Sequence, residues 1–136
     1  MPRILCIDYG RKKIGLAVTD PLQIIVSGLD TVPRADLDNF LEKYLKEEKV
    51  EKIVLGDPGA SNERTALLQK EIFNYKNKLS KKYPEIVFDY QDESYSSHDA
   101  KAVILASGAK RKKRRDKALV DKVSAILILQ DHLNHK

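Results

Sequence analysis

The feature that most constrains the fold is a short apolar run at residues 4–7, which ends in Asp8 and is followed two residues later by Gly10. Four apolar residues, of which Ile4 and Ile7 are β-branched, predict a strand that is buried on both faces. A carboxylate at the point where such a strand leaves the core is costly unless it is paired or holds a cation. Gly10 permits a sharp turn or the close approach of a ligand. We interpret Asp8 as the first ligand of a divalent-metal site that handles phosphate.

The length and composition set limits on the class of protein. A chain of 136 residues is enough for one hydrophobic core, so we expect a single domain over residues 1–136. A single cysteine, Cys6, excludes an internal disulfide framework and is expected to be a small buried residue. The sequence has no signal-peptide pattern and no apolar run long enough to span a membrane. We therefore expect a soluble cytoplasmic protein with no membrane partner.

The order of apolar patterns predicts the fold class. Alternating or continuous apolar runs predict strands over residues 4–8, 14–19, 24–32, 53–56 and 86–90, the first two joined as a hairpin by the turn at 10–12. Helical spacing predicts helices over residues 35–48, 64–81 and about 97–107, and a last helix from near Asp116. These elements add up to an α/β domain of three layers, in which helices flank a mixed central sheet.

Three acids from distant segments are predicted to meet. Asp8 and Glu93 both follow strands, and ligands bind at the carboxyl ends of strands in such sheets. Asp121 lies in the last helix among apolar residues, on the face that also carries Ser124 and Ala125, which suggests close packing on the sheet. Carboxylates are the ligands that Mg²⁺ or Mn²⁺ prefers, and two such ions can promote hydrolysis of a phosphodiester.

Basic residues gather in two places near these acids. Arg11 and Lys12, with Lys13, follow the first strand, and residues 110–115 form an unbroken basic run consisting of Lys110, Arg111, Lys112, Lys113, Arg114 and Arg115. Six adjacent like charges repel one another, and a polyanion would remove that cost. The run has no aromatic residue, so we expect it to bind a nucleic-acid backbone rather than stack on bases.

Three motifs, taken in order, resemble a known family. They are Asp8-Tyr9-Gly10 with Gly15, the pair Asp92-Glu93, and the stretch from Lys112-Lys113-Arg114-Arg115 to Asp121-Lys122, Ala125 and Leu127-Ile128-Leu129-Gln130. This set is similar to the YqgF family of ribonuclease-H-like, Holliday-junction-resolvase-like proteins. The resemblance implies a ribonuclease-H-like fold, Mg²⁺-dependent phosphodiester cleavage and maturation of the 5′ end of 16S rRNA. It also implies that Asp8, Glu93 and Asp121 are the catalytic, metal-binding acids.

The chain departs from the family pattern at two places. The family usually has an arginine directly after the glutamate, where this chain has Ser94, which removes one expected phosphate contact. The loop at residues 56–63 differs from the family's usual apolar, Asn-Gly-like loop. This change could alter contacts with the substrate or bring Asp57 near the metal.

Each candidate residue also has an ordinary structural interpretation. Asp8 could pair with Lys12 or Lys13, and Glu93 could be a solvated loop acid. Asp121 could pair with Lys117, one helical turn away. Other polar residues have weaker claims as metal ligands, as hydrogen-bond partners of the ligands or as a general acid. These are Asp57, Asp92, His98, Asp116, His132 and His135.

Several functions remain open from sequence alone. The first is a nuclease acting on precursor rRNA or the ribosomal subunit, and the second is a resolvase acting on four-way DNA, which would require a homodimer rather than a monomer. A non-catalytic RNA- or ribosome-binding module is a third. The Asp-x-Gly hairpin also resembles the phosphate loop of phosphotransferases and ATPases of the actin and sugar-kinase type, but those proteins close two domains around a nucleotide.

Overall fold

The computed structural model describes residues 2–10, 13–92 and 117–134, with the backbone alone for residues 117–122 and 134. The elements follow the alternating order that the apolar pattern predicts. They are β1 (Arg3–Tyr9), β2 (Lys13–Thr19), β3 (Val26–Pro33), the 3₁₀ turn η1 (Arg34–Asp36), α1 (Leu37–Glu47), β4 (Val50–Asp57), α2 (Glu63–Lys82), β5 (Val87–Asp92) and α5 (Lys117–Asn134). The helix expected near residues 97–107 lies outside the described residues.

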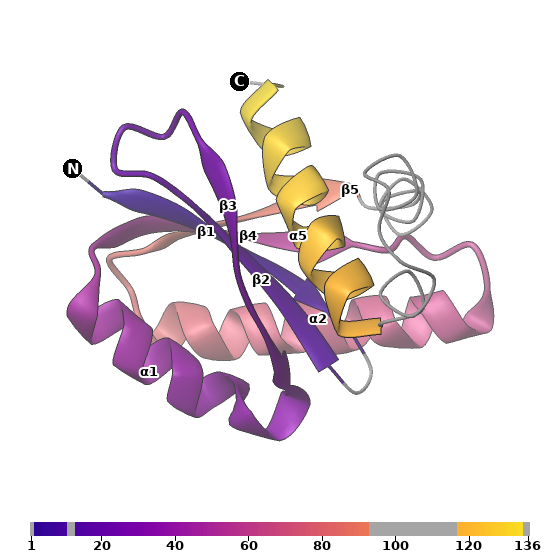
Figure 1. Cartoon of the computed structure of the whole chain (residues 1–136). Coiled ribbons are helices and arrows are strands. Elements are labelled where there is room, and N and C mark those ends of the chain that lie inside the picture. The colour runs from indigo at the N-terminus through magenta and orange to yellow at the C-terminus, as the bar shows by residue number, and fades with distance from the viewer. Residues whose placement is uncertain (1, 11–12, 93–116, 135–136) are drawn as a thin grey trace, which may run out of the picture.

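The five strands form one mixed sheet in the order β3-β2-β1-β4-β5 (Figure 1). β1 pairs with β2, and β2 with β3, in antiparallel directions, which confirms the predicted hairpin. β1 pairs with β4, and β4 with β5, in parallel. The carboxyl ends of β1, β3, β4 and β5 therefore all lie at one edge of the sheet.

Helices cover both faces of the sheet, as predicted for a three-layer domain (Figure 1). On one face, Leu5, Ile7 and Tyr9 of β1 pack in a cluster that includes Leu41 of α1 and Ile72 of α2. On the other face, the alternate residues of β1 pack against α5. This second cluster contains Ile4, Cys6, Ala17, Val54, Ala125, Ile128 and Leu129. Cys6 is fully buried, as expected of a small core residue.

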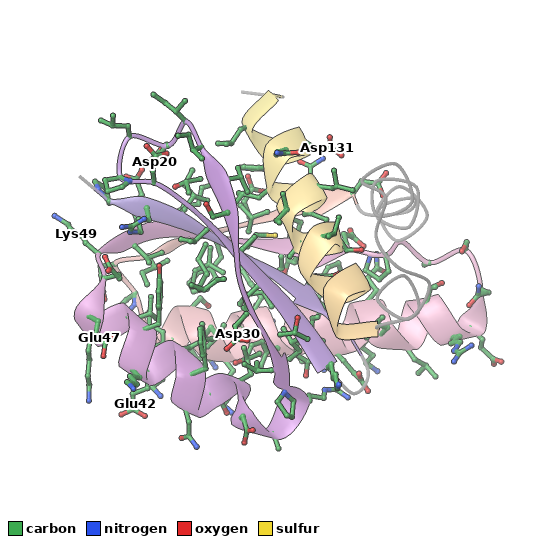
Figure 2. The ribbon with its side chains drawn as sticks, viewed as in Figure 1. Asp20, Asp30, Glu42, Glu47, Lys49 and Asp131 are labelled. Atoms are coloured by element: carbon green, nitrogen blue, oxygen red, sulfur yellow. The ribbon has the colours of Figure 1, made fainter. Side chains whose placement is uncertain are left out.

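The third strand begins later than the sequence predicts. Ile24 and Ile25, expected in the strand, are 71% and 63% exposed and lie in the connection that precedes it. The carboxylate of Asp20 accepts hydrogen bonds at 2.8 Å from the backbone N–H groups of both residues, and Figure 2 shows Asp20 in this connection. Gln23 adopts a φ of 60° there. The Asp20 side chain thus holds these residues in a turn although their type favours a strand.

The last helix packs closely on the sheet through its small residues. Ser124 and Ala125 are fully buried, which confirms the expected close approach. His132, in the last turn of this helix, is also buried. It lies three and four residues after Leu129 and Ile128 and so shares their buried stripe. None of the helices described in this structure is long and apolar enough to cross a membrane.

Candidate active site

Asp8 lies at the carboxyl end of β1, where the strand separates from one of its neighbours. The parallel register with β4 ends at Ile7 and Leu55, whereas the antiparallel register with β2 continues through the pair of Asp8 and Gly15. Residues of a strand alternate between faces, so Asp8 follows Ile4 and Cys6 onto the face that α5 covers. The side chain is half-buried. A carboxylate thus stands at the edge where the parallel strands have their carboxyl ends, as the sequence predicts.

Asp121 belongs to α5, the helix that covers this face. It lies four residues, or about 6 Å along the helix axis, before the fully buried Ala125. The amino-terminal, orange end of α5 points toward the carboxyl end of β1 in Figure 1, and the yellow end toward the opposite edge. The backbone of Asp121 is therefore in the part of α5 nearer the edge that carries Asp8. Its side chain is outside the described part of the chain.

The other predicted site residues fall beyond the described segments. Glu93 comes directly after β5, whose last residue is Asp92. Arg11 and Lys12 follow β1, and the basic run Lys110, Arg111, Lys112, Lys113, Arg114 and Arg115 precedes α5; all of these lie outside the described residues. The sheet topology brings the ends of β1 and β5 to the same edge, and the roles of these residues stay predictions.

Asp57 turns away from the face that Asp8 occupies. Its Oδ1 atom accepts hydrogen bonds from the backbone N–H of Gly59 at 2.8 Å and from Nε2 of Gln69 in α2 at 2.9 Å. Strand alternation agrees, because Leu55 packs in the cluster on the α1 and α2 side. These two bonds order the loop after β4 and tie it to α2. The departure from the family loop therefore supplies a structural acid on the opposite face from Asp8.

Gly10 is required by a close approach of the chain to itself. A Cβ atom at this position would lie 2.4 Å from the backbone oxygen of Lys13. The sequence left open whether Gly10 serves a turn or a ligand, and the structure shows that the Lys13 carbonyl takes up this space. The tight hairpin fixes the end of β1 directly after Asp8 and Tyr9.

A polar cluster that the sequence analysis did not predict lies on the opposite face of β1 from Asp8. Nε of Arg34 donates a hydrogen bond to the hydroxyl of Tyr9 at 2.7 Å, and its guanidinium lies 4.6 Å from the centre of the Tyr9 ring. Partial burial opposes the charge on Arg34, yet its hydrogen bonds to Glu71 and Tyr9 outweigh this and raise its pKa. Residues 9 and 34 come from different elements, so no spacing in the sequence connects them. Tyr9, directly after Asp8, was the only sequence feature that pointed to this cluster.

The Tyr75 hydroxyl extends this cluster to α1. It donates a hydrogen bond to Oδ1 of Asp38 at 2.7 Å, and Nζ of Lys78 lies 3.2 Å from Oδ2 of the same carboxylate. Burial and the nearby Asp38 carboxylate raise the pKa of Tyr75. The Tyr75 hydrogen bond, supported by Lys78, lowers the pKa of Asp38 below its usual range. These shifts favour a charged Arg34, a charged Asp38 and a neutral Tyr75 near neutral pH.

The chemistry of the described donor fits a hard divalent cation. Asp8 supplies carboxylate oxygens at a half-buried position on the edge of the sheet, and Mg²⁺ and Mn²⁺ prefer oxygen ligands. Within the described residues, no group of three His, Cys, Asp or Glu side chains could hold a metal ion. Asp8 is thus the one member of the predicted ligand set whose side chain lies in the described part of the chain.

The fold is similar to that of two solved structures. Its backbone is similar to the fowlpox virus Holliday junction resolvase, with a TM-score of 0.56 and 11% identity over 98% of both chains. It is also similar to RuvC of T. thermophilus, solved in complex with a Holliday junction substrate, with a TM-score of 0.58 and 13% identity over 98% of this chain and 96% of that one. At such low identity these likenesses establish the fold alone, which is the predicted ribonuclease-H-like, resolvase-type fold.

The sequence comparisons then identify the family. The RuvX family, described as a Holliday junction resolvase, matches residues 2–135, and the chain belongs to this family. This confirms the resemblance to YqgF proteins. A protein of Phocaeicola vulgatus is 46% identical over 100% of this chain and 98% of its own length. One from Porphyromonas gingivalis is 49% identical over 99% and 98%. Both relatives carry the name "Putative pre-16S rRNA nuclease".

Proposed function

We propose that this protein is a metal-dependent nuclease that hydrolyses phosphodiester bonds at the 5′ end of precursor 16S rRNA during ribosome biogenesis in the cytoplasm. The observation that carries the proposal is the position of Asp8, a half-buried carboxylate at the carboxyl end of β1 in a resolvase-type fold. The choice of substrate rests on full-length relatives that are named as nucleases of pre-16S rRNA.

In this proposal Asp8, Glu93 and Asp121 hold one or two Mg²⁺ or Mn²⁺ ions. A bound divalent ion would lower the pKa of a water molecule and stabilise negative charge on the phosphate oxygens. The Asp8 carboxylate supplies negative charge at a fixed point of the sheet edge, and the hairpin closed at Gly10 keeps it there. Glu93 and Asp121 would complete the set of oxygen ligands from the end of β5 and from α5.

Basic residues would bind the nucleic-acid backbone beside these acids. The proposed contacts are Arg11, Lys12, Lys110, Arg111, Lys112, Lys113, Arg114 and Arg115. Each contact between a basic side chain and a phosphate releases counterions, so binding should weaken steeply with added salt. Because these contacts carry no base readout, the site of cleavage would be selected by the shape of the RNA.

A second candidate function is resolution of four-way DNA. Two observations favour it, namely the description of the matching family and the fold shared with two Holliday junction resolvases. Such a reaction requires two active sites arranged symmetrically, so it would require this chain to act as a homodimer. Processing of rRNA is compatible with a monomer.

One cleavage assay tests both functions. Wild-type protein is incubated with a precursor of the 16S rRNA 5′ end and, separately, with a four-way DNA junction, each with and without Mg²⁺. We expect cleavage of the RNA only with Mg²⁺, and loss of it in Asp8→Asn at unchanged RNA affinity. Asp89→Asn is the matched control, because Asp89 is a half-exposed acid on β5 that pairs with Lys52 at 3.6 Å. RNA binding with no cleavage under any condition would instead support a non-catalytic binding module.

A further inference from the structure

The end of β1 that carries Asp8 is not paired with β4, so other contacts must hold it in place. Pairing with β4 ends at Ile7 and Leu55, and pairing with β2 continues to Tyr9 and Ile14. Beyond Ile7, the position of the backbone therefore depends on β2 and on the contacts of the Tyr9 side chain. That side chain lies on the face opposite Asp8 and is only 8% exposed.

The Tyr9 side chain is contacted by Arg34 and by Tyr75. The Arg34 guanidinium stacks over its ring at 4.6 Å and donates a hydrogen bond through Nε to its hydroxyl at 2.7 Å. The Tyr75 ring lies on it at 5.3 Å with a tilt of 35°. A cation over an aromatic face and an offset ring contact are both attractive, and the hydrogen bond adds direction. Together they leave the Tyr9 ring little freedom to move.

The groups that hold Tyr9 are themselves anchored to the helical layer. Nη2 of Arg34 forms an ion pair with Glu71 of α2. Tyr75 of α2 is fixed by Asp38 of α1, which also pairs with Lys78. The clamp thus joins η1, α1 and α2 behind the last residues of β1. We call Tyr9, Arg34, Asp38, Glu71 and Tyr75 the Tyr9 clamp.

We propose that Arg34 is a positioning residue for Asp8, because it locks Tyr9 in the Tyr9 clamp and so fixes the strand end from which the Asp8 carboxylate projects. Arginine suits this role because its planar fork can stack on the ring and donate to Tyr9 and Glu71 at the same time. A lysine carries the charge without that geometry. This inference rests on the proposed function, since it gives the clamp a part in that reaction.

The test compares Arg34→Met and Arg34→Lys with a matched control, Arg3→Met. Arg3 lies at the other end of β1, where it forms an ion pair with Glu48 at 3.2 Å and donates a hydrogen bond to the Thr19 carbonyl at 3.0 Å. Its side chain is 26% exposed and that of Arg34 is 33% exposed. Both arginines therefore stabilise the fold by similar contacts, but only Arg34 is behind Asp8.

Three measurements are made on each variant. Steady-state cleavage of the precursor rRNA gives kcat and KM, calorimetry gives Mn²⁺ affinity, and amide hydrogen exchange by NMR reports the backbone of Asp8 and Tyr9. For Arg34→Met we expect kcat and Mn²⁺ affinity each to fall about 10-fold, with KM changed less than twofold. Exchange at Asp8 and Tyr9 should rise about 10-fold. Arg34→Lys should remain impaired, and Arg3→Met should change none of the three although it lowers Tm.

Several outcomes would overturn the inference. Wild-type kcat and Mn²⁺ affinity in Arg34→Met would do so, and so would full recovery in Arg34→Lys or an equal loss in Arg3→Met. A rise in KM with kcat unchanged would show that Arg34 contacts the RNA instead. If wild-type protein cleaves neither substrate, the proposed function has failed, and Mn²⁺ affinity and amide exchange still decide whether Arg34 fixes Asp8.

Discussion

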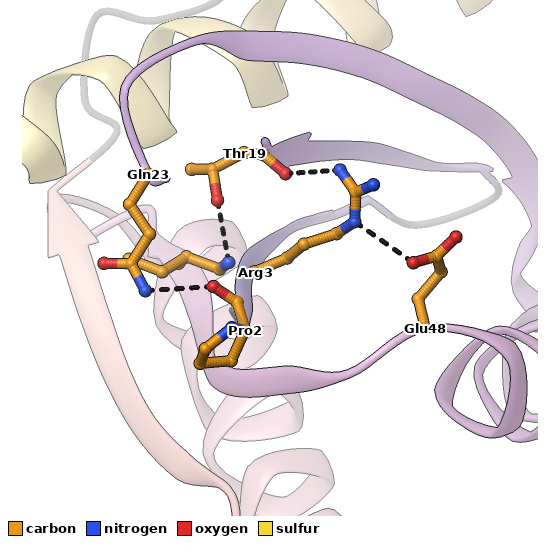
Figure 3. A network of polar contacts seen from close by, with 6 residues as sticks. Pro2, Arg3, Thr19, Gln23 and Glu48 are labelled. Carbon is orange, nitrogen blue, oxygen red and sulfur yellow. Dashed lines mark hydrogen bonds and ion pairs between the residues drawn. The ribbon is translucent and has the colours of Figure 1, made fainter. Parts of the chain in front are cut away.

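An arginine holds each end of β1, but only at the carboxyl end does a carboxylate, that of Asp8, lie on the face opposite the arginine contact. At the amino end, Arg3 bridges Glu48 and the Thr19 carbonyl, and the buried hydroxyl of Thr19 accepts the backbone N–H of Ile4 at 2.9 Å (Figure 3). Nε2 of Gln23 donates to the carbonyl of Pro2 at 3.1 Å in the same network. These contacts join the start of β1 to the ends of β2 and α1.

At the carboxyl end, the arginine contact and the acid lie on opposite faces of the strand. Arg34 binds the Tyr9 side chain on the α1 and α2 side, and Asp8 follows the α5 side. The strand is therefore fixed from behind while the adjacent carboxylate stands at the sheet edge. Similar polar contacts therefore hold both ends of β1, and at the carboxyl end strand alternation places the Arg34 contact and the Asp8 carboxylate on opposite faces.

The largest expected difference between the two ends is in catalysis. We expect Asp8→Asn to lower cleavage of precursor rRNA by about 10³-fold or more, since it removes the charge of a proposed metal ligand. At the amino end, Glu48→Gln should leave the rate unchanged and cost stability only. Rates are measured with Mg²⁺, and circular dichroism checks that both variants fold. A fully active Asp8→Asn protein would remove Asp8 from the site.

The next largest expected effect is a loss of stability when Gly10, in the hairpin after Asp8, is replaced. Gly10→Ala should destabilise the protein by about 2 kcal/mol or more, because its Cβ would meet the Lys13 carbonyl oxygen at 2.4 Å. Gly59→Ala is the control: its φ of +76° is unfavourable for alanine, but nothing lies within 4 Å of the added Cβ. It should cost about 1 kcal/mol. Urea unfolding measures both, and equal losses would contradict the close-approach argument.

The third prediction concerns the amino end alone. Thr19→Val keeps the shape of a fully buried side chain and removes the oxygen that accepts the Ile4 N–H. An unsatisfied buried N–H group costs about 2 kcal/mol, so the free energy of unfolding should fall by that amount. Cleavage activity should stay at the wild-type level. A loss of activity at equal folded fraction would show that the two ends of β1 are coupled.

The smallest expected effect is a pH dependence of the free energy of unfolding that comes from Asp38 of the Tyr9 clamp. The pKa of Asp38 is lowered in the folded state by the Tyr75 hydrogen bond, so its contribution to stability is present above the ordinary value of 3.8 and is lost as pH falls through the folded value. Because Asp38 is half-exposed, we expect only about 0.5 kcal/mol. The free energy of unfolding of wild type and of Asp38→Asn is measured at pH 7, 5 and 3, and the difference between the two should become smaller as the pH falls. A difference that does not depend on pH would contradict the lowered pKa of Asp38.

Local patterns in the sequence predicted most of the described fold. The apolar run before Asp8, the helical spacing that predicted α1 and α2, and the small residues Ser124 and Ala125 each depend on near neighbours in the chain, and the structure confirms these elements. Leu67 is an exception, because it was expected in the apolar stripe of α2 and is 60% exposed. The start of β3 was missed because the Asp20 carboxylate captures the N–H groups of Ile24 and Ile25. A single side chain there outweighed the preference of two residues for a strand.

For the site, the sequence by itself determined the type of residue and its place along the chain. It placed an acid at the end of the first buried strand and a glycine two residues later, and these follow from strand burial and the needs of a tight hairpin. Only the tertiary structure decided the rest: that Asp57 is bound to α2 on the other face, and that Arg34 reaches Tyr9. The physical reason is that these contacts join residues from different elements, and their partners are set by how strands and helices pack, which no local periodicity records.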